Sequence, residues 1–519
     1  MKSKKVMSLI VVLMVTANVF SGCSKVTPKP TSTTASIAKQ IVISRPADSD
    51  NLDYVMQDGN VNIWMFNLAL DGLVKSSDDG KSVQPNLADS WDISPDKLLY
   101  TFHLKKDIKF SDGTPVKGSD WVFSLTRARD TKGTAWAFSL EAIKDISSPD
   151  DNTVVIKLKN VWAPIIADLA MFNASVTSES YFNKVGAQAY SQLPIGTGPY
   201  MFKEWKKGEY IQLEKNPYYW EKGLPKTEAI KIKVVPDDNT RILQLQSGEV
   251  DATTDVPWNR MAELNSDPKL TSLAIPSTET RYVQFNTTKK ELSDKRVRLA
   301  LDYATDKRAL AKTVLFGYGQ DAKSFMAKAG SFWNDTLVPN AYDVNKAKEL
   351  LAAAGYKDGF DVTITLSAGN IVSQSIATVL KEQWKKVGVN LNIEMLETAT
   401  ATEKFKSMKS SITLRGWTND MVDASQQVDY MCVYSNIKNF YTGWDNPEIE
   451  KLALQGKTEI DKEKRQAIYY KIQELYAQDM PMITLFHVQY PVAMKKSLKG
   501  FVQTPLGNYR FKNLEMPAK

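Results

Sequence analysis

Residues 343–393 restrict the possible fold more than any other part of the chain, because helix-type and strand-type patterns alternate there. The segments are a helix over 343–354, a strand over 362–366, a helix over 374–387 and a strand over 389–393. Asp343 can cap the first helix, and Gly355 and Gly388 can end the two helices. A strand, a crossover helix and a second strand form a right-handed βαβ unit with parallel strands. This half of the chain therefore predicts an α/β fold, in which ligands bind outside the carboxyl ends of strands.

Strand and helix patterns are also mixed elsewhere. Strand-type runs cover residues 40–44, 153–159 and 229–235. Asn446 is expected to cap a later helix that has Pro447 at its first position and Gly456 just past its end.

The first 22 residues have the features of a secretory signal. Residues 1–5 are basic, and the fifteen residues 6–20 carry little polarity. As a helix this run would reach about 22 Å, which is short of the hydrocarbon core of about 30 Å. A cleavable signal is therefore favoured over a membrane span.

A cysteine follows this signal. Residues 20–23, Phe-Ser-Gly-Cys, resemble the lipobox of bacterial lipoproteins, although Phe20 stands where leucine is usual. In that family the cysteine becomes the lipidated first residue, so Cys23 would anchor the chain to a membrane surface. Alternatively, the signal is cut at small residues and Cys23 is incidental. Residues 23–39 are predicted to form the lipidated cysteine and a flexible tether.

The composition fits a soluble globular protein and excludes several kinds of site. The 66 Lys and Arg against 59 Asp and Glu give +7, and without the three signal lysines 63 against 59 leave +4. This mild charge does not indicate nucleic-acid binding. Two histidines and two cysteines are too few for a His- or Cys-built metal site, an iron–sulfur cluster or a disulfide scaffold. No metal and no cofactor are predicted.

Sequence motifs of common catalytic sites are missing. There is no G-x-S-x-G or H-E-x-x-H motif. Residues 80–82, Gly-Lys-Ser, mimic the end of a phosphate loop, but Lys75 stands where a glycine is needed. His103 and His487 lie in strand-type runs and are interpreted as structural, and Cys432 as a buried thiol. The chain is therefore predicted to bind rather than to catalyse.

Several stretches, spread from about residue 40 to the C-terminus, resemble the extracellular solute-binding proteins of peptide ABC importers, the oligopeptide- and dipeptide-binding family 5. They occur in the order of that family: 71–74, 85–91, 100–104, 108–116, 120–124, 196–200, 214–220, 285–288, 296–304, 317–319, 416–417, 499–502 and 505–507.

Two of these stretches carry turn chemistry. Residues 112–115, Asp-Gly-Thr-Pro, predict a turn before a helix that Ser119 or Asp120 can cap. Residues 196–199, Gly-Thr-Gly-Pro, supply conformationally permissive glycines where the chain is expected to re-enter a sheet.

The resemblance implies a two-lobed fold like that of periplasmic binding proteins, with an extra α+β domain in the first lobe. The first domain would be discontinuous and combine residues 40–70, 190–290 and 489–519. The second would cover residues 71–189, and the hinged third residues 291–488. Ligand would be enclosed between the first and third domains.

The resemblance also implies site residues. Relatives fix the amino terminus of the ligand with an aspartate shortly after a Gly-Trp pair, and Asp420 matches it after Gly416 and Trp417. A buried ammonium needs a carboxylate partner. Asp423 is the nearby alternative. Trp417 would form an apolar wall for a ligand side chain, although core packing remains open for it.

Other site residues are expected on two further segments. Asp58, Gly59 and Asn60 would form a β-like segment that pairs with the main chain of the ligand. Trp136 and Phe138 would face the cleft, with a core role as the alternative for both.

The ligand is predicted to be longer than a dipeptide. Relatives specialised for dipeptides clamp the carboxylate with an arginine of the third domain, and residues 367–371 carry no arginine or lysine.

The predicted protein is a monomeric, lipid-anchored receptor on the outside of the bacterial cell membrane. It would deliver oligopeptides to permease subunits that ATPases drive. Another solute, such as a nickel or other metal chelate or a sugar-like compound, remains the alternative ligand. An extracytoplasmic hydrolase or a peptide-dependent chaperone is the alternative of another class.

Overall fold

The computed structural model describes residues 37–57 and 59–518, apart from the side chains of residues 437–439. Cys23, the signal and most of the tether therefore lie outside the described residues, as does Asp58. None of the described helices combines the length and the apolar character that crossing a bilayer requires.

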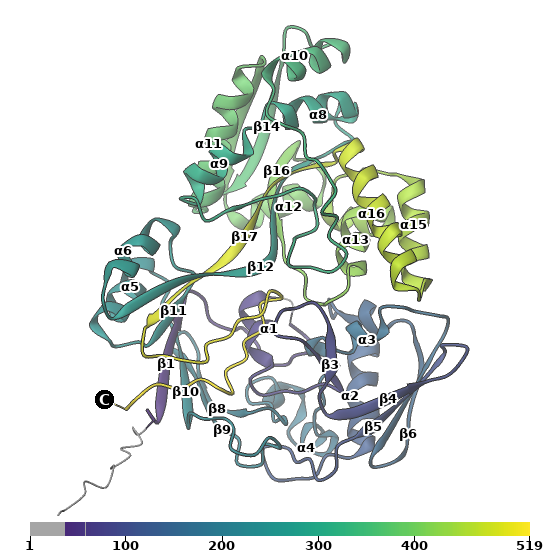
Figure 1. Ribbon diagram of the computed structural model, residues 1–519, viewed down its shortest axis with the longest axis vertical. Coiled ribbons are helices and arrows are strands. Elements are labelled where there is room, and N and C mark those ends of the chain that lie inside the picture. Colours follow the sequence, from purple (N-terminus) through teal and green to yellow (C-terminus); the bar gives the residue numbers. More distant parts are fainter. Residues whose placement is uncertain (1–36, 58, 519) are drawn as a thin grey trace, which may run out of the picture. The chain divides into compact units, whose positions relative to one another are not determined.

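Among the described residues, eleven strands form one large sheet (Figure 1). Ten of them follow the order β15 (Val389–Leu396), β14 (Phe360–Ser367), β16 (Ile412–Trp417), β12 (Leu270–Phe285), β17 (Met482–Lys495), β11 (Ala252–Thr254), β1 (Gln40–Arg45), β10 (Ala229–Val234), β9 (Tyr210–Lys215) and β8 (Tyr200–Lys206). The eleventh, β13 (Gln320–Asp321), pairs with β17.

Two long antiparallel strands, β12 and β17, connect the two ends of this sheet (Figure 1). Their pairing runs from Leu270 opposite Lys495 to Gln284 opposite Met482. The register shifts between Pro276 and Thr280, where the ladder is irregular. A bulge of this kind bends a strand and increases its local twist. We therefore expect β12 to bend between Pro276 and Thr280.

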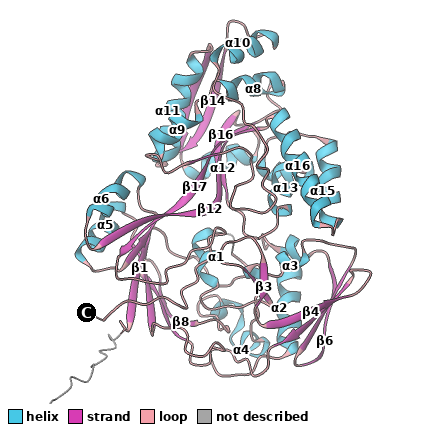
Figure 2. Ribbon diagram, in the orientation of Figure 1, coloured by secondary structure: helices cyan, strands magenta, loops and turns pink. Residues whose placement is uncertain are grey.

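Two smaller sheets lie outside the large one. The first has the order β4 (Ala88–Ile93), β5 (Leu99–Leu104), β7 (Thr153–Leu158) and β6 (Ile143–Asp150), and β2 (Val74–Ser76) pairs with β3 (Val83–Pro85) in the second. Figure 2 shows β4 and β6 away from the strands of the large sheet.

Helices flank these sheets (Figure 2). They are α1 (Asn60–Phe66), α2 (Gly118–Asp130), α3 (Ile165–Asp168), α4 (Glu179–Tyr190), α5 (Asp238–Ser247), α6 (Met261–Ser266), α7 (Lys290–Ser293), α8 (Lys295–Tyr303), α9 (Lys307–Val314), α10 (Val344–Ala353), α11 (Ile371–Lys385), α12 (Thr398–Lys406), α13 (Ser425–Cys432), α14 (Tyr434–Phe440), α15 (Pro447–Thr458) and α16 (Lys462–Asp479).

The predicted βαβ unit is confirmed as β14, α11 and β15. The two strands are parallel and pair in one register from Phe360 opposite Val389 to Ser367 opposite Leu396. The helix before the unit is α10, and its cap Asp343 accepts a hydrogen bond from the backbone N–H of Lys346 at 2.9 Å. The strands predicted at 40–44, 153–159 and 229–235 are β1, β7 and β10, within a residue or two at their ends.

Two predicted helix boundaries were wrong. Helix α15 continues through Gly456 to Thr458, because this buried glycine makes room for a neighbour: a Cβ there would lie 3.0 Å from the ring of Tyr469 on α16. Helix α2 begins at Gly118 after the cap residue Lys117, whose N–H donates to the Asp120 carboxylate at 2.9 Å. Asp120 therefore completes the cap from the third helical position, and neither it nor Ser119 is the cap itself.

The motif at residues 196–199 leads into β8, so the expected entry into a sheet is confirmed. The expected reason for its glycines, conformational freedom, was wrong. Gly196 and Gly198 are not among the residues with positive φ. A Cβ on Gly196 would lie 2.3 Å from the carbonyl oxygen of Ala69, and a Cβ on Gly198 would lie 2.5 Å from its carbonyl carbon. Close backbone approach explains these glycines.

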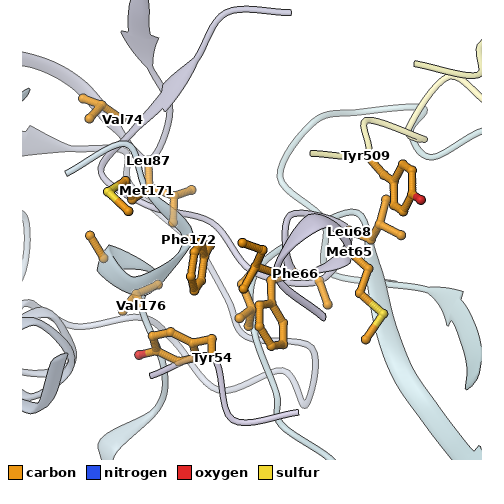
Figure 3. Packing of buried hydrophobic residues seen from close by; sticks show 14 of the residues in the cluster. Tyr54, Met65, Phe66, Leu68, Val74, Leu87, Met171, Phe172, Val176 and Tyr509 are labelled. Atoms are coloured by element: carbon orange, nitrogen blue, oxygen red, sulfur yellow. The ribbon is translucent and has the colours of Figure 1, made fainter. Parts of the chain in front are cut away.

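A buried apolar cluster fixes the N-terminal helix α1 against the segment that contains Met171, Phe172 and Val176 (Figure 3). Phe66 and Phe172 stack with ring centroids 6.0 Å apart. The hydroxyl of Tyr54 donates to the carbonyl oxygen of Ser175 at 3.0 Å. The first turn of α1 is therefore held in place, and its residue Asn60 lines the cavity described next.

Candidate ligand-binding site

A cavity of about 520 Å³ lies where the ends of β1 and β11 approach α1, β12 and the residues that follow β16. It is lined by Arg45, Pro46, Ala47, Asn60, Val61, Trp64, Trp136, Thr254, Asp255, Glu279, Arg281, Gly416, Trp417, Thr418, Asp420 and Tyr509. Its volume falls in the range of small-molecule sites, about 300–1,000 Å³.

Five of the residues predicted from the sequence meet in this cavity: Asn60, Trp136, Gly416, Trp417 and Asp420. The β-like segment predicted for residues 58–60 was wrong at Asn60, because Asn60 is the first residue of helix α1, whereas Gly59 before it is extended. Phe138 is not on the lining; it lies 6.1 Å from the ring of Trp136 and 5.7 Å from that of Tyr430. Phe138 therefore has the packing role that the sequence left open.

Asp420 has a buried oxygen without a partner. Its backbone N–H donates to Oε1 of Gln426 at 3.0 Å, and its Oδ2 accepts from Nε2 of Gln426 at 3.1 Å. Its Oδ1 is buried and has no hydrogen-bond partner among the described residues. Burial raises the pKa of Asp420 to about 7, against the effect of the Gln426 hydrogen bond. A buried carboxylate of this kind is stabilised by a cation that enters the cavity.

The alternative aspartate, Asp423, is already occupied. Its two carboxylate oxygens pair with the guanidinium of Arg465, with 2.7 Å between Oδ1 and Nη2. Oδ1 also accepts from the backbone N–H of Ser425 at 2.9 Å. Both side chains of the pair are buried. Geometry therefore favours Asp420 over Asp423 as the carboxylate that is free for a ligand.

Trp417 packs against a buried cluster and also lines the cavity. Its ring lies 4.9 Å from that of Tyr430 and 5.2 Å from that of Phe440, at the edge of a buried cluster. Its Nε1 donates to Oδ1 of Asn419 at 2.9 Å, which fixes the ring orientation. The half-buried indole also lines the cavity, so it presents a rigid apolar surface there.

An ion pair on the cavity wall was missed from the sequence. Glu279 and Arg281 of β12 pair at 2.5 Å between Oε1 and Nη2. Gly416 lies opposite Arg281 in the β12–β16 ladder, and a Cβ on it would come within 2.9 Å of the guanidinium. The sequence of residues 278–282, Thr-Glu-Thr-Arg-Tyr, alternates charged and uncharged side chains. This alternation could have placed Glu279 and Arg281 together on one face of the strand, opposite the buried Thr278, Thr280 and Tyr282.

Asp255 is a second carboxylate on the lining that the sequence did not single out. It follows β11 with φ of +54°, in the left-handed region that side chains rarely adopt. Its surroundings raise its pKa through desolvation, opposed by its hydrogen bond with Thr254 and by Arg241. The lining thus has two carboxyl groups without an ion pair to a described residue, Asp255 and Asp420, whereas Arg281 is paired with Glu279 and Arg45 lies 3.6 Å from Asp48.

The family model of the bacterial extracellular solute-binding proteins, family 5 (middle region), matches residues 82–439. Heme-binding protein A of Haemophilus influenzae is 31% identical over 474 residues, 86% of each chain. The dipeptide-binding protein of Escherichia coli is 29% identical and covers 84% of this chain and 86% of its own.

Solved structures share the fold. DppA from Helicobacter pylori in complex with the peptide STSA has a TM-score of 0.81 and 26% identity, with 93% of this chain and 98% of the other covered. AppA from Bacillus subtilis in complex with a nonapeptide has a TM-score of 0.79 and 26% identity, with 93% and 100% covered. The predicted two-lobed fold of periplasmic binding proteins is thereby confirmed. The chain belongs to the bacterial extracellular solute-binding proteins, family 5.

Proposed function

We propose that this protein captures peptides outside the cytoplasm and delivers them to the permease of an ABC importer. The observation that carries the proposal is the buried, unpartnered Oδ1 of Asp420 on the wall of a 520 Å³ cavity. The ammonium at the amino terminus of a peptide supplies both the charge and the hydrogen-bond donors that this oxygen lacks. Relatives named for peptide and dipeptide complexes support this choice of ligand.

The main chain of the peptide would pair with β16. Residues 412 and 413 of this strand pair with β14 on one side, whereas residues 414–417 have no strand on that edge among the described residues. A free strand edge binds extended peptides through main-chain hydrogen bonds and tolerates many side chains. Gly59 and Asn60, at the start of α1, are proposed to contact the peptide as well, and Asp58 remains part of this proposal.

The remaining parts of the proposal concern domains and ligand length. Residues 40–70, 190–290 and 489–519 would form the first domain, 71–189 the second and 291–488 the third, with β12 and β17 as the hinge. A ligand that touches both sides of the hinge favours the closed state through its additional contacts. Ligands longer than dipeptides are proposed because residues 367–371 offer no cation for a carboxylate.

We further propose that the protein works as a monomer that a lipid on Cys23 holds at the bacterial cell membrane. Such an anchor keeps the receptor within reach of its permease without a membrane span.

A peptide is preferred over a metal chelate because of the side chains on the lining. Among the described residues that line the cavity there is no histidine, cysteine or methionine, and both histidines lie elsewhere. The chemistry of the wall is therefore carboxylate, guanidinium and aromatic.

Native mass spectrometry of the purified protein tests the proposed function. We expect a series of co-purified peptide masses, because a site that holds the main chain accepts many sequences. A single co-purified mass that matches a metal chelate would mean that the ligand is another solute. Hydrolysis of added peptides would mean that the protein is an enzyme.

The raised pKa of Asp420 predicts that peptide affinity depends on pH. Only the ionised carboxylate pairs with the ligand ammonium, so affinity should fall as the pH drops below the pKa of about 7. The fall approaches tenfold per pH unit well below the pKa and amounts to about fifteenfold between pH 7 and 5.5, because half of the carboxylate is already protonated at pH 7. Calorimetry with tri-alanine across this range measures it. Equal affinity at both ends of the range would contradict an ionised Asp420 as the partner.

A further inference from the structure

A second cavity, of about 650 Å³, lies on the other face of β12. Glu279 and Arg281 line the Asp420 cavity, whereas the intervening Thr280 contacts Nδ1 of His487 at 2.9 Å, and His487 lines the second cavity. Successive side chains of a strand point to opposite faces. The C-terminal segment separates the cavities as well, with Pro505 on the second and Tyr509 on the first. The second cavity is therefore not part of the proposed peptide site.

Three polar atoms on the wall of the second cavity have no hydrogen-bond partner in the described part of the chain. They are Nε2 of His487, Oε1 of Gln503 and Nε1 of Trp333. The side chains of His487 and Gln503 are deeply buried, with only 3% and 5% of each residue exposed. Buried polar atoms without partners are costly, and native proteins rarely leave several in one place. Their gathering indicates that this cavity holds a polar ligand.

The carboxylates on this wall are already partnered. Asp321 pairs with Arg308 at 2.9 Å. Asp79 accepts hydrogen bonds from the Ser77 hydroxyl at 2.6 Å and from the Lys81 N–H at 3.1 Å. Asp78 lies 3.9 Å from Nε of Arg510. Two of the three carboxylates therefore face an arginine, and Asp79 is held by neutral donors.

The lysines on this wall are not compensated in the same way. Lys81, Lys323 and Lys328 line the cavity, and none forms an ion pair with a described carboxylate. Lys323 donates to the carbonyl oxygen of Asp335 at 3.0 Å. The ammonium groups of Lys323 and Lys328 each lie 5.8 Å from the ring centroid of Trp333. The wall thus presents unbalanced positive charge next to a flat aromatic surface.

We propose that the second cavity binds an aromatic carboxylate of about ten to fifteen non-hydrogen atoms, a size that suits a site of this volume. Its carboxylate would face Lys81, in the turn between β2 and β3, and Lys323 and Lys328, in the segment that follows β13. Its ring would lie against Trp333 and the apolar walls of Pro276 and Pro505. A hydroxyl on the ring would donate to Oε1 of Gln503. The proposal is independent of the peptide function, because the lining of the second cavity has no residue in common with the lining of the Asp420 cavity.

Calorimetry with 4-hydroxyphenylacetate tests this site. We expect a dissociation constant of about 0.1 to 1 mM. This value agrees with the binding free energy per non-hydrogen atom of small ligands, since the compound has eleven such atoms. The double variant Lys81→Gln/Lys328→Gln should weaken binding about tenfold or more, because two exposed ammonium groups lose their charge. The matched control is Lys312→Gln, which changes an exposed lysine of α9 that is not on the cavity lining, and it should leave binding unchanged.

Two further measurements separate this site from its alternatives. Asp420→Asn should leave 4-hydroxyphenylacetate binding intact, and the neutral amide of the same compound should bind at least tenfold more weakly. Loss of binding in Asp420→Asn would place the compound in the peptide cavity and overturn the proposal. The proposal is also overturned if no heat is observed at about 5 mM ligand, if the amide binds equally well, or if the double lysine variant keeps its affinity.

Discussion

Replacing Asp420 with asparagine should weaken tri-alanine binding by about 30- to 1,000-fold at about pH 7.5. The substitution keeps the shape and the Gln426 contact but leaves the ligand ammonium buried without a carboxylate. Removing one partner of a buried charge pair costs about 2 to 4 kcal/mol in comparable interfaces, which corresponds to that range of affinity. Isothermal titration calorimetry measures the change directly.

Asp255→Asn is the matched control for Asp420→Asn. It removes a carboxylate from another wall of the same cavity, so it tests whether any negative charge there is sufficient. We expect it to change tri-alanine affinity by about threefold or less, because long-range charge effects are screened in a solvated cavity. Equal losses in the two variants would mean that Asp420 has no specific contact with the ligand ammonium.

Breaking the buried ion pair between Asp423 and Arg465 should produce the largest loss of stability. Both side chains are more than nine-tenths buried, and a lone buried charge in place of a pair costs about 3 to 5 kcal/mol. Asp423→Asn should therefore lower the free energy of unfolding by about that amount. Urea unfolding followed by circular dichroism measures it.

Two comparisons identify the cause of that loss. The double variant Asp423→Asn/Arg465→Met removes both charges and should recover a substantial part of the stability, since no uncompensated charge remains. Arg308→Gln breaks an exposed pair with Asp321, whose side chains are 84% and 59% exposed, and should cost less than about 1 kcal/mol. If Asp423→Asn costs as little as Arg308→Gln, the buried pair does not hold this region together.

The α/β unit could be predicted because its signals are local. The cap at Asp343, the glycines 355 and 388, and the apolar periodicity all lie within the elements that they define. The end of α15 could not be predicted in this way. Gly456 resembles a helix stop in sequence, but its role is to admit Tyr469 of a neighbouring helix, which is a tertiary contact.

The same distinction between local signals and tertiary contacts applies to the candidate site. Asp420 and Trp417 were predicted through their resemblance to a motif, which favoured Asp420 but left Asp423 open as the alternative. The difference comes from Arg465, which lies forty-two residues further along the chain. Glu279, Arg281, Asp255 and Tyr509 reach the cavity from β12, from the end of β11 and from the C-terminal segment. Only the pairing of distant strands brings these side chains together.

The recognition of a free peptide amino terminus is tested most directly by native mass spectrometry with a mixed tripeptide library, half of it N-acetylated. Acetylation removes the ammonium and adds a small acetyl group, so discrimination between the halves reports on the recognition of the free amino terminus, which the proposal assigns to Asp420. We predict that the wild-type protein retains free-amine peptides and excludes their acetylated counterparts by about 100-fold. Retention of both halves in equal amounts would contradict the proposed mode of binding.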